Sequence, residues 1–195
     1  MPRTVDHEAR RAALVEVTAQ HIAGVGIEGV RLRDVARAAG WTTGAVSHYF
    51  PDKRTLLLTT FRSRTEASSR LFDAAARTRP GVLAASIDAL LPLDEERTLN
   101  WRVWLAFWGA AVGDEELAGE QHRRQLLFTE RLARTVRGAQ ELGEARPDLD
   151  VDQTARFLAA LVDGVSIQAV FAPDVWPPAE QCRFVRRHLA DLAPR

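Results

Sequence analysis

The sequence contains very little cysteine, tyrosine, methionine or lysine. Among its 195 residues each of these types occurs once, as Cys182, Tyr49, Met1 and Lys53. A single cysteine excludes a disulfide framework within the chain and a multi-cysteine metal site. The first residues are charged and lack the apolar run of a signal peptide, and the longest apolar stretch, residues 103–112, is too short to span a bilayer. We therefore expect a cytoplasmic protein with no membrane partner.

Patterns that would indicate an enzyme or a metalloprotein are also missing. None of the five histidines stands in a Glu-x-x-His or His-x-x-x-His pattern. Cys182 and His188 are separated by about 120° around a helix, which is poor geometry for a nucleophile and its base. The sequence has no phosphate-binding loop, dinucleotide fingerprint or nucleophile elbow. We expect no catalytic residue, no metal site and no cofactor.

What the sequence does contain favours helices. Ala, Leu, Arg and Glu are frequent, and segments with helical periodicity are separated by short breaks of Gly and Pro. No segment alternates as a strand would. The spacing predicts an all-α protein with about nine helices. They are expected near residues 6–24, 32–39, 43–49, from 52 onward, 81–91, 94–112, 114–142, 151–171 and 178–192.

Charge is divided unevenly along the chain, although the net charge is zero. Residues 1–65 hold ten basic and six acidic side chains, a net charge of +4, which leaves −4 for the remainder. A basic N-terminal part on an acidic body is typical of a module that meets nucleic-acid phosphates.

The strongest local pattern lies in residues 30–50. Val35 and Ala36 give a short first helix an apolar face. Gly40 suits a tight turn that needs a positive φ, and Thr42 is a natural N-cap for a second short helix. The pattern predicts a helix-turn-helix whose second helix enters the major groove of DNA.

These residues resemble the tetracycline-repressor family. The matching positions are Val35-Ala36, Ala39-Gly40, Thr42-Thr43-Gly44-Ala45-Val46, Tyr49-Phe50 and Asp52-Lys53. Within that family, Thr43-Gly44 followed by Ser47-His48 is similar to the betaine-pathway repressor (BetI-like) branch. The resemblance implies a homodimer, with a DNA-binding domain over residues 1–51 and a ligand-binding and dimerisation domain over residues 52–195. It implies a repressor that a small apolar or cationic effector releases from double-stranded operator DNA.

The resemblance also implies which residues meet DNA. The expected set is Arg31, Arg33, Thr42, Thr43, Gly44, Ser47, His48, Tyr49 and Lys53. Hydroxyl and imidazole groups can bind base edges or phosphates, and the Lys53 ammonium can pair with a phosphate. Two alternatives stay open, namely that Tyr49 packs internally and that His48 is only solvated.

Arg31 departs from the family pattern, which usually has Ser or Thr at this position. An arginine cannot accept the free N–H groups at a helix start, so we expect the helix cap to be lost there. Asp34 in the first turn offsets part of that loss through the helix dipole. Arg31 either reaches a phosphate or is solvated, and the sequence leaves both interpretations open.

Residues 100–112 form a segment rich in tryptophan. Trp101, Trp104 and Trp108 share one helical face, which can line an apolar pocket, stack on a flat ligand or cage a cation. Core packing is the alternative for each ring. The expected ligand-binding set is Trp101, Trp104, Trp108, Phe128, Phe157 and Leu161. Asp163 is the nearest acid, but its position between Val162 and Gly164 favours a satisfied hydrogen-bonding role in the core.

The last two helices carry the expected dimer contact. One face of the final helix holds Phe184, Val185, His188, Leu189 and Leu192, and Gly164 in the preceding helix permits close approach. We expect a self-complementary four-helix interface. Ordinary packing within one subunit is the alternative for this face.

A second function fits the same sequence. A helical small-molecule carrier with a vestigial DNA-binding head would show the same patterns. Specific, salt-sensitive binding to promoter DNA separates a regulator from such a carrier.

Overall fold

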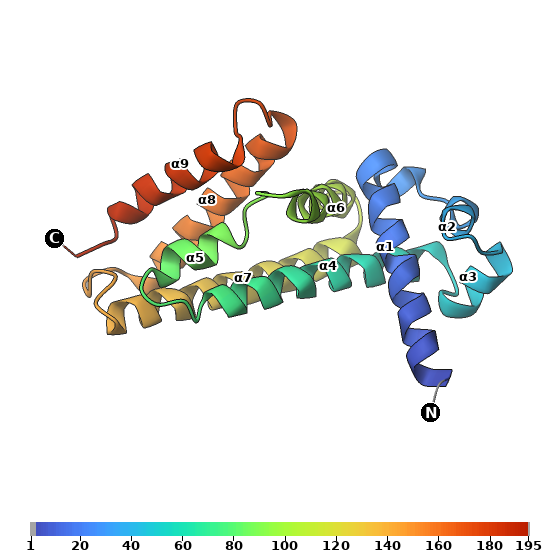
Figure 1. Ribbon diagram of the computed structural model, residues 1–195, viewed down its shortest axis with the longest axis horizontal. Coiled ribbons are helices and arrows are strands. Elements are labelled where there is room, and N and C mark those ends of the chain that lie inside the picture. Colours follow the sequence, from blue (N-terminus) through green and yellow to red (C-terminus); the bar gives the residue numbers. More distant parts are fainter. Residues whose placement is uncertain (1–2, 195) are drawn as a thin grey trace.

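The computed structural model describes residues 3–194, with side chains from His7 onward. Over this range all regular structure is helical, with nine helices and no strand, so the predicted all-α fold is confirmed (Figure 1). The helices are α1 (Arg3–Gly29), α2 (Leu32–Ala38), α3 (Thr43–Tyr49), α4 (Lys53–Ala75), α5 (Val82–Asp88), α6 (Glu95–Ala111), α7 (Glu115–Glu141), α8 (Val151–Phe171) and α9 (Pro178–Ala190).

Most helix boundaries agree with the periodicity of the sequence, and α3 and α8 begin and end where the sequence predicts. The largest difference is α1, which continues past the expected end near residue 24 to Gly29. A residue with φ of 70°, Gly26, lies inside it and kinks the helix. The sequence signal at Gly24 therefore marks the right region but not the residue at which the backbone changes direction.

The molecule is elongated (Figure 1). Helices α1, α2 and α3 form one end. Helices α4 and α7 extend from there along the molecule, and α5, α8 and α9 pack at the far end. Helix α6 crosses between the two parts and contacts α1, α4, α7 and α8. It therefore connects the two ends of the protein.

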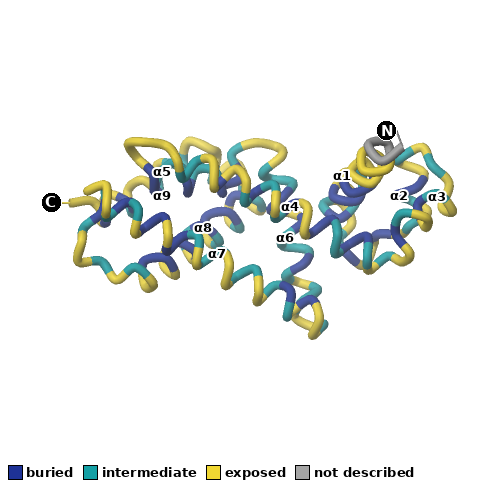
Figure 2. Tube along the Cα trace, turned by 90° about the horizontal axis from the view of Figure 1, so that it is seen from below, coloured by how far each residue is buried: buried dark blue, intermediate teal, exposed yellow. Residues whose placement is uncertain are grey.

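Two hydrophobic clusters hold the fold together (Figure 2). The first joins α1, α2, α3 and the start of α4, and it also takes Val103 and Phe107 from α6 and Leu117 from α7. The second joins the end of α4 with α5 to α9. Because the first cluster crosses residue 51, the boundary between domains 1–51 and 52–195 stays a prediction.

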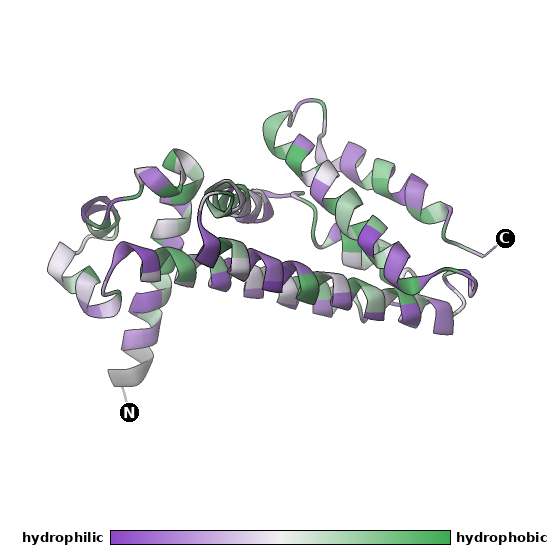
Figure 3. Cartoon of the chain, turned by 180° about the vertical axis from the view of Figure 1, so that it is seen from behind, coloured by the Kyte–Doolittle hydropathy of each residue, from purple (hydrophilic) through white to green (hydrophobic). Residues whose placement is uncertain are grey.

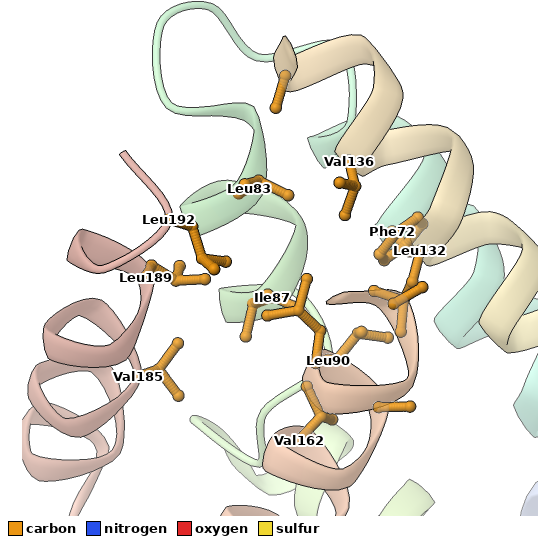
Figure 4. Close-up of a cluster of buried hydrophobic side chains, with 14 of the residues drawn as sticks. Phe72, Leu83, Ile87, Leu90, Leu132, Val136, Val162, Val185, Leu189 and Leu192 are labelled. Atoms are coloured by element: carbon orange, nitrogen blue, oxygen red, sulfur yellow. The ribbon is translucent and has the colours of Figure 1, made fainter. Parts of the chain in front are cut away.

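The apolar face of α9 is turned inward. Val185, Leu189 and Leu192 are buried in the second cluster, where they face Leu83 and Ile87 of α5 (Figure 4). The assignment of Val185 and Leu189, and of Leu192 just beyond the end of α9, to a dimer interface was therefore wrong, and the alternative of packing within one subunit holds for them. Phe184 and His188, the rest of the predicted face, are half-buried, and Phe184 packs against the same cluster. The sequence shows that α9 is amphipathic but not which neighbour covers its apolar face.

Helix α8 is the one helix, among the described residues, that is long and apolar enough to cross a membrane by length and composition. In the fold it contacts α6, α7 and α9. Figure 3 shows its hydrophobic residues together with those of the neighbouring helices in the body of the protein. The core helix of a bundle passes the same test, so this feature is explained by packing.

Candidate DNA-binding surface and ligand cavity

Helices α2 and α3 are joined by a tight turn. Gly40 adopts a φ of 73° there, and the backbone N–H of Trp41 donates to the carbonyl of Ala36 at 2.8 Å. The side chain of Thr42 then caps α3, because its Oγ1 accepts from the N–H of Ala45 at 3.2 Å. Val46 anchors α3 in the first hydrophobic cluster, because its side chain is fully buried there. The helix-turn-helix geometry thus follows from local residues.

One side of α3 faces solvent. Thr43, Gly44, Ser47 and His48 are exposed, as is the capping residue Thr42. Their spacing puts them on one face of the helix, opposite the buried Val46. The structure therefore brings together five of the nine residues expected to face DNA, and contact between them and DNA stays a prediction.

Tyr49 sits in a group of aromatic rings and is half-buried. Its ring lies 4.5 Å from that of His7, 5.5 Å from that of Trp41 and 5.5 Å from that of His48, centre to centre. Packing and phosphate binding are compatible here, because the rings can fix a side chain whose hydroxyl still reaches out. Sequence reasoning missed His7, which lies too far along the chain for any local pattern.

A hydrogen bond from Lys53 links the start of α4 to the end of α1. Its Nζ donates to the backbone carbonyl of Glu28 at 3.1 Å, which places the ammonium beside the end of α1. Arg31 and Arg33 are exposed, and Arg31 is the N-cap of α2 without a side-chain capping bond. The predicted loss of that cap is confirmed. Asp34 instead accepts from Arg37 at 2.8 Å.

Helices α4 and α7 run in the same direction, and ion pairs bridge them at three places, the first of which involves both Asp114, the N-cap of α7, and Glu116. Arg54 binds Asp114 at 2.8 Å, Arg62 binds Glu120 at 3.1 Å, and Arg131 binds Asp73 at 2.6 Å. Hydrogen bonds from Arg54 hold the pKa of Asp114 well below its usual range. Arg62 lowers the pKa of Glu120 to about 2. Both acids therefore stay ionised near neutral pH.

A cavity of about 330 Å³ lies between the second and third of these ion pairs. Residues of α4, α6, α7 and α8, together with Leu90, form its wall. Trp104, Trp108 and Phe128, three of the six expected ligand-binding residues, line it. This volume lies within the range of small-molecule sites.

The other three residues of the expected set lie outside the cavity lining. Trp101 is buried, and its Nε1 donates to the carbonyl of Leu90 at 2.7 Å. Its ring packs edge-on against Trp104 and Trp108, with centres 4.9 Å and 6.2 Å away. Phe157 is 44% exposed on α8. Leu161 is half-buried and packs against the second hydrophobic cluster.

Asp163 is the acid in the cavity wall contributed by α8. Within the part of the chain that the structure describes, its carboxylate forms no hydrogen bond or ion pair, contrary to the satisfied core role favoured by the sequence. Burial raises the pKa of Asp163 to about 7. A half-buried carboxylate without a partner, in a site that raises its pKa, is costly, so this residue is a candidate for binding a ligand.

Two family models match the chain. Residues 81–194 match the BetI-type transcriptional repressor C-terminal family, and residues 14–60 match the bacterial regulatory proteins of the tetR family. The chain belongs to the TetR family. This TetR-family protein is therefore a ligand-responsive, DNA-binding transcription regulator rather than an enzyme, as the sequence predicts.

Curated relatives agree with the family models. The HTH-type transcriptional regulator BetI of Burkholderia cenocepacia is 33% identical over 176 residues, covering 88% of each chain. The BetI regulator of Cronobacter sakazakii is 31% identical and covers 100% of this chain and 98% of that protein. The similarity extends through both the DNA-binding end and the body, so the resemblance to the BetI-like branch is confirmed.

Solved structures share the fold. A transcriptional regulator from Saccharomonospora viridis, determined in complex with choline, has a TM-score of 0.83 at 26% identity, covering 96% of this chain and 99% of that one. A TetR-family regulator from a Rhodococcus species has a TM-score of 0.80 at 24% identity, covering 95% of this chain and 98% of that one. These neighbours place the regulator among all-helical TetR-family proteins.

Proposed function

We propose that this regulator represses transcription in the cytoplasm until a small quaternary ammonium cation enters the cavity and releases it from its operator. The observation that carries the proposal is the unpartnered carboxylate of Asp163 in the same wall as Trp104, Trp108 and Phe128. Aromatic faces attract a cation, and a carboxylate supplies the opposite charge.

The cavity favours a quaternary cation over a primary ammonium. An NH₃⁺ group donates three hydrogen bonds, and the ring faces of Trp104, Trp108 and Phe128 accept none of them, although hydroxyl and amide groups elsewhere in the wall can. A trimethylammonium group needs no hydrogen-bond acceptor and gains from apolar contact. The relative from Saccharomonospora viridis, whose structure contains choline, supports a ligand of this kind.

Helix α4 connects the ligand cavity to the DNA-binding end. It begins at Lys53, beside α3, and its residues Phe61 and Phe72 belong to the cavity wall. A ligand that tilts α4 would change the separation of two recognition helices, which must enter major grooves about 34 Å apart. A loss of tenfold to a hundredfold in DNA affinity requires about 1.4–3 kcal/mol of coupling between the sites.

Calorimetric titration with choline tests this proposal. We expect binding to the unaltered protein, a loss of at least a hundredfold in Asp163→Asn, and a similar loss in the double variant Trp104→Ala, Trp108→Ala. Choline should lower operator affinity, and saturating operator DNA should weaken choline binding by the same factor. Equal choline affinity with and without operator would contradict the proposal. So would unchanged binding in both variants.

The DNA contacts are proposed from the exposed face of α3. Thr43, Ser47 and His48 would face the base edges, while Arg31, Arg33, Tyr49 and Lys53 would meet phosphates. The support is the common exposure of the α3 residues, together with the buried anchor Val46 beneath them. Substitutions at Thr43 or Ser47 should change which operator is preferred, which a comparison of binding to a panel of operator sequences would measure.

A homodimer is proposed through the outer face of α8. Phe157, Ala160, Gly164, Gln168 and Phe171 are exposed and share this face. A Cβ atom placed on Gly164 would meet no atom within 4 Å, so a second helix can approach closely. Gly164 lies seven positions from Phe157 and seven positions from Phe171. A two-fold axis at Gly164 therefore places Phe157 of one subunit opposite Phe171 of the partner subunit. Phe171 is 75% exposed, which is unusual for so large an apolar side chain.

Sedimentation tests the dimer. The double variant Phe157→Glu, Phe171→Glu should be monomeric and still helical, because both side chains are exposed in the subunit. The matched control is Leu142→Glu, since Leu142 is similarly exposed (48%) but lies at the end of α7. An intact dimer in the double variant would move the interface elsewhere.

A further inference from the structure

Arg124 lies in the cavity wall with a buried N–H group that makes no hydrogen bond. This group is its Nε, which forms only an ion contact with Glu120. The guanidinium lies over the ring of Phe61, 4.8 Å from its centre, and the Arg124 side chain is 18% exposed. Burial lowers the pKa of Arg124, yet a guanidinium stays charged at neutral pH.

The nearby carboxylate of Glu120 does not account for this arginine. Glu120 accepts two hydrogen bonds from Arg62, at 3.1 Å and 3.2 Å, and another from Arg123. The Nε of Arg124 lies 3.4 Å from the same carboxylate, in an ion contact without hydrogen-bond geometry. Three guanidinium groups therefore share one carboxylate, and Arg124 is the one that lines the cavity without a hydrogen bond. Glu66 in the same wall adds a favourable negative charge near Arg124 but no hydrogen bond, so the buried N–H of Arg124 is costly unless an acceptor completes it.

A second donor in the wall is also free. The indole Nε1 of Trp104 is buried and has no hydrogen-bond partner among the residues described. The same cavity thus holds one carboxylate without a partner, at Asp163, and two buried N–H groups without a hydrogen bond, the Nε of Arg124 and the Nε1 of Trp104. A trimethylammonium group alone would satisfy only the carboxylate.

We infer that the effector is a zwitterion, with a quaternary ammonium bound by Asp163 and the aromatic rings and an anionic group bound by Arg124 and the Trp104 indole N–H. This inference depends on the proposed function, since it assigns the second half of the same ligand. Carboxylate and phosphate groups share the required chemistry, because either accepts two parallel hydrogen bonds from one guanidinium. A zwitterion also adds no net charge to the cavity.

The test compares probes that share the trimethylammonium group and differ in the rest. Tetramethylammonium and choline have no anionic group. Trimethylglycine and 4-(trimethylammonio)butanoate carry a carboxylate on a short and a longer spacer, and phosphocholine carries a phosphate. We expect at least one anionic probe to bind the unaltered protein ten to a hundred times more tightly than choline, as a charge-assisted hydrogen bond allows. The tightest probe identifies the anionic group and its spacing.

Two variants attribute the gain to Arg124. In Arg124→Gln the anionic probe should lose its advantage over choline, and in Arg124→Lys it should keep part of it. The matched control is Arg62→Gln, which removes another partner of Glu120 but does not line the cavity. The advantage should persist there. Because the advantage is a ratio of two affinities in one protein, a general loss of stability does not imitate the result.

The outcomes separate this inference from the proposed function. If no trimethylammonium probe binds, the proposed function itself fails. If choline and tetramethylammonium bind but no anionic probe binds more tightly than choline, the inference of a zwitterionic effector is wrong, whereas the proposed cation site is supported. If an anionic probe binds more tightly than choline and keeps that advantage in Arg124→Gln, the assignment of the anionic group to Arg124 is wrong.

Discussion

The exposed face of α3 and the cavity between α4 and α7 both present polar groups that make no hydrogen bond with any of the described residues. On α3 these groups, such as Ser47 and His48, are in contact with water, so leaving them unpaired has little effect on folding. In the cavity the carboxylate of Asp163 and the donors of Arg124 and Trp104 are largely removed from water. Each of these buried groups lowers the stability of the empty protein.

This difference predicts opposite responses to mutation. Replacing a polar residue on the α3 face should affect DNA binding with little change in stability. Replacing Asp163 in the cavity should weaken ligand binding and also stabilise the empty protein, as in other sites where function opposes stability. Four predictions, in order of decreasing effect, test that comparison.

The largest effect is expected for Asp163→Asn. Because the pKa of Asp163 is raised to about 7, ionising it costs folding free energy above its unfolded value near 4. The empty protein should therefore lose stability as pH rises from about 4 to 7. The variant should be more stable by about 2–4 kcal/mol above pH 7, after allowance for solvent in the cavity. Thermal melts at pH 4.5 and pH 8 measure this, and an equal difference at both values would contradict it.

The next effect is expected for Lys53→Gln. The amide keeps hydrogen-bond donors, one bond closer to the backbone than the ammonium that binds the Glu28 carbonyl, but carries no charge to pair with a phosphate. Operator affinity should fall about tenfold across all sequences, and the slope of log affinity against log salt concentration should flatten by about 0.9 for each phosphate that is no longer neutralised. Stability should stay within about 0.5 kcal/mol of the unaltered protein. An unchanged salt slope would remove Lys53 from the DNA-binding residues.

A smaller effect is expected for Thr42→Ala. The variant loses the capping bond from the Ala45 N–H, which should cost about 1 kcal/mol of stability. Thr42→Ser is the control, because serine restores the cap but removes the methyl group. Denaturant titration of the two variants separates capping from any contact with DNA. Equal stability of both would show that the cap contributes little.

The smallest effect is expected for Arg31→Ser. Arg31 has the extended backbone of an N-cap but makes no capping bond, so serine should stabilise α2 by about 0.5–1 kcal/mol. If Arg31 also meets a phosphate, operator affinity should fall although stability rises. Measuring both quantities on one variant decides between the two interpretations left open by the sequence.

The DNA-binding end was predictable because its determinants are local. The turn at Gly40, the cap at Thr42 and the buried Val46 act within a few residues of one another, and the α3 boundaries follow from them. The body was predictable as a set of helices for the same reason. Trp104, Trp108 and Phe128 were expected near a ligand and do line one cavity.

The chemistry of that cavity could not be predicted in the same way. Asp163 was interpreted as a satisfied core residue, and Arg124 carried no pattern that distinguishes it from Arg123. Their roles depend on which helices meet. Glu120 is already occupied by Arg62 from α4, and that contact joins residues 58 positions apart.

The sequence by itself thus determined the helices, the helix-turn-helix and the family, because these depend on periodicity, capping and turn residues close together in the chain. Only the tertiary structure decided which apolar faces are internal and which polar groups are left without partners. The inward face of α9, the open face of α8 around Gly164 and the lone carboxylate of Asp163 are all of this kind. Burial and pairing depend on contacts between helices that are distant in the sequence, and a helical pattern is the same whichever neighbour covers it.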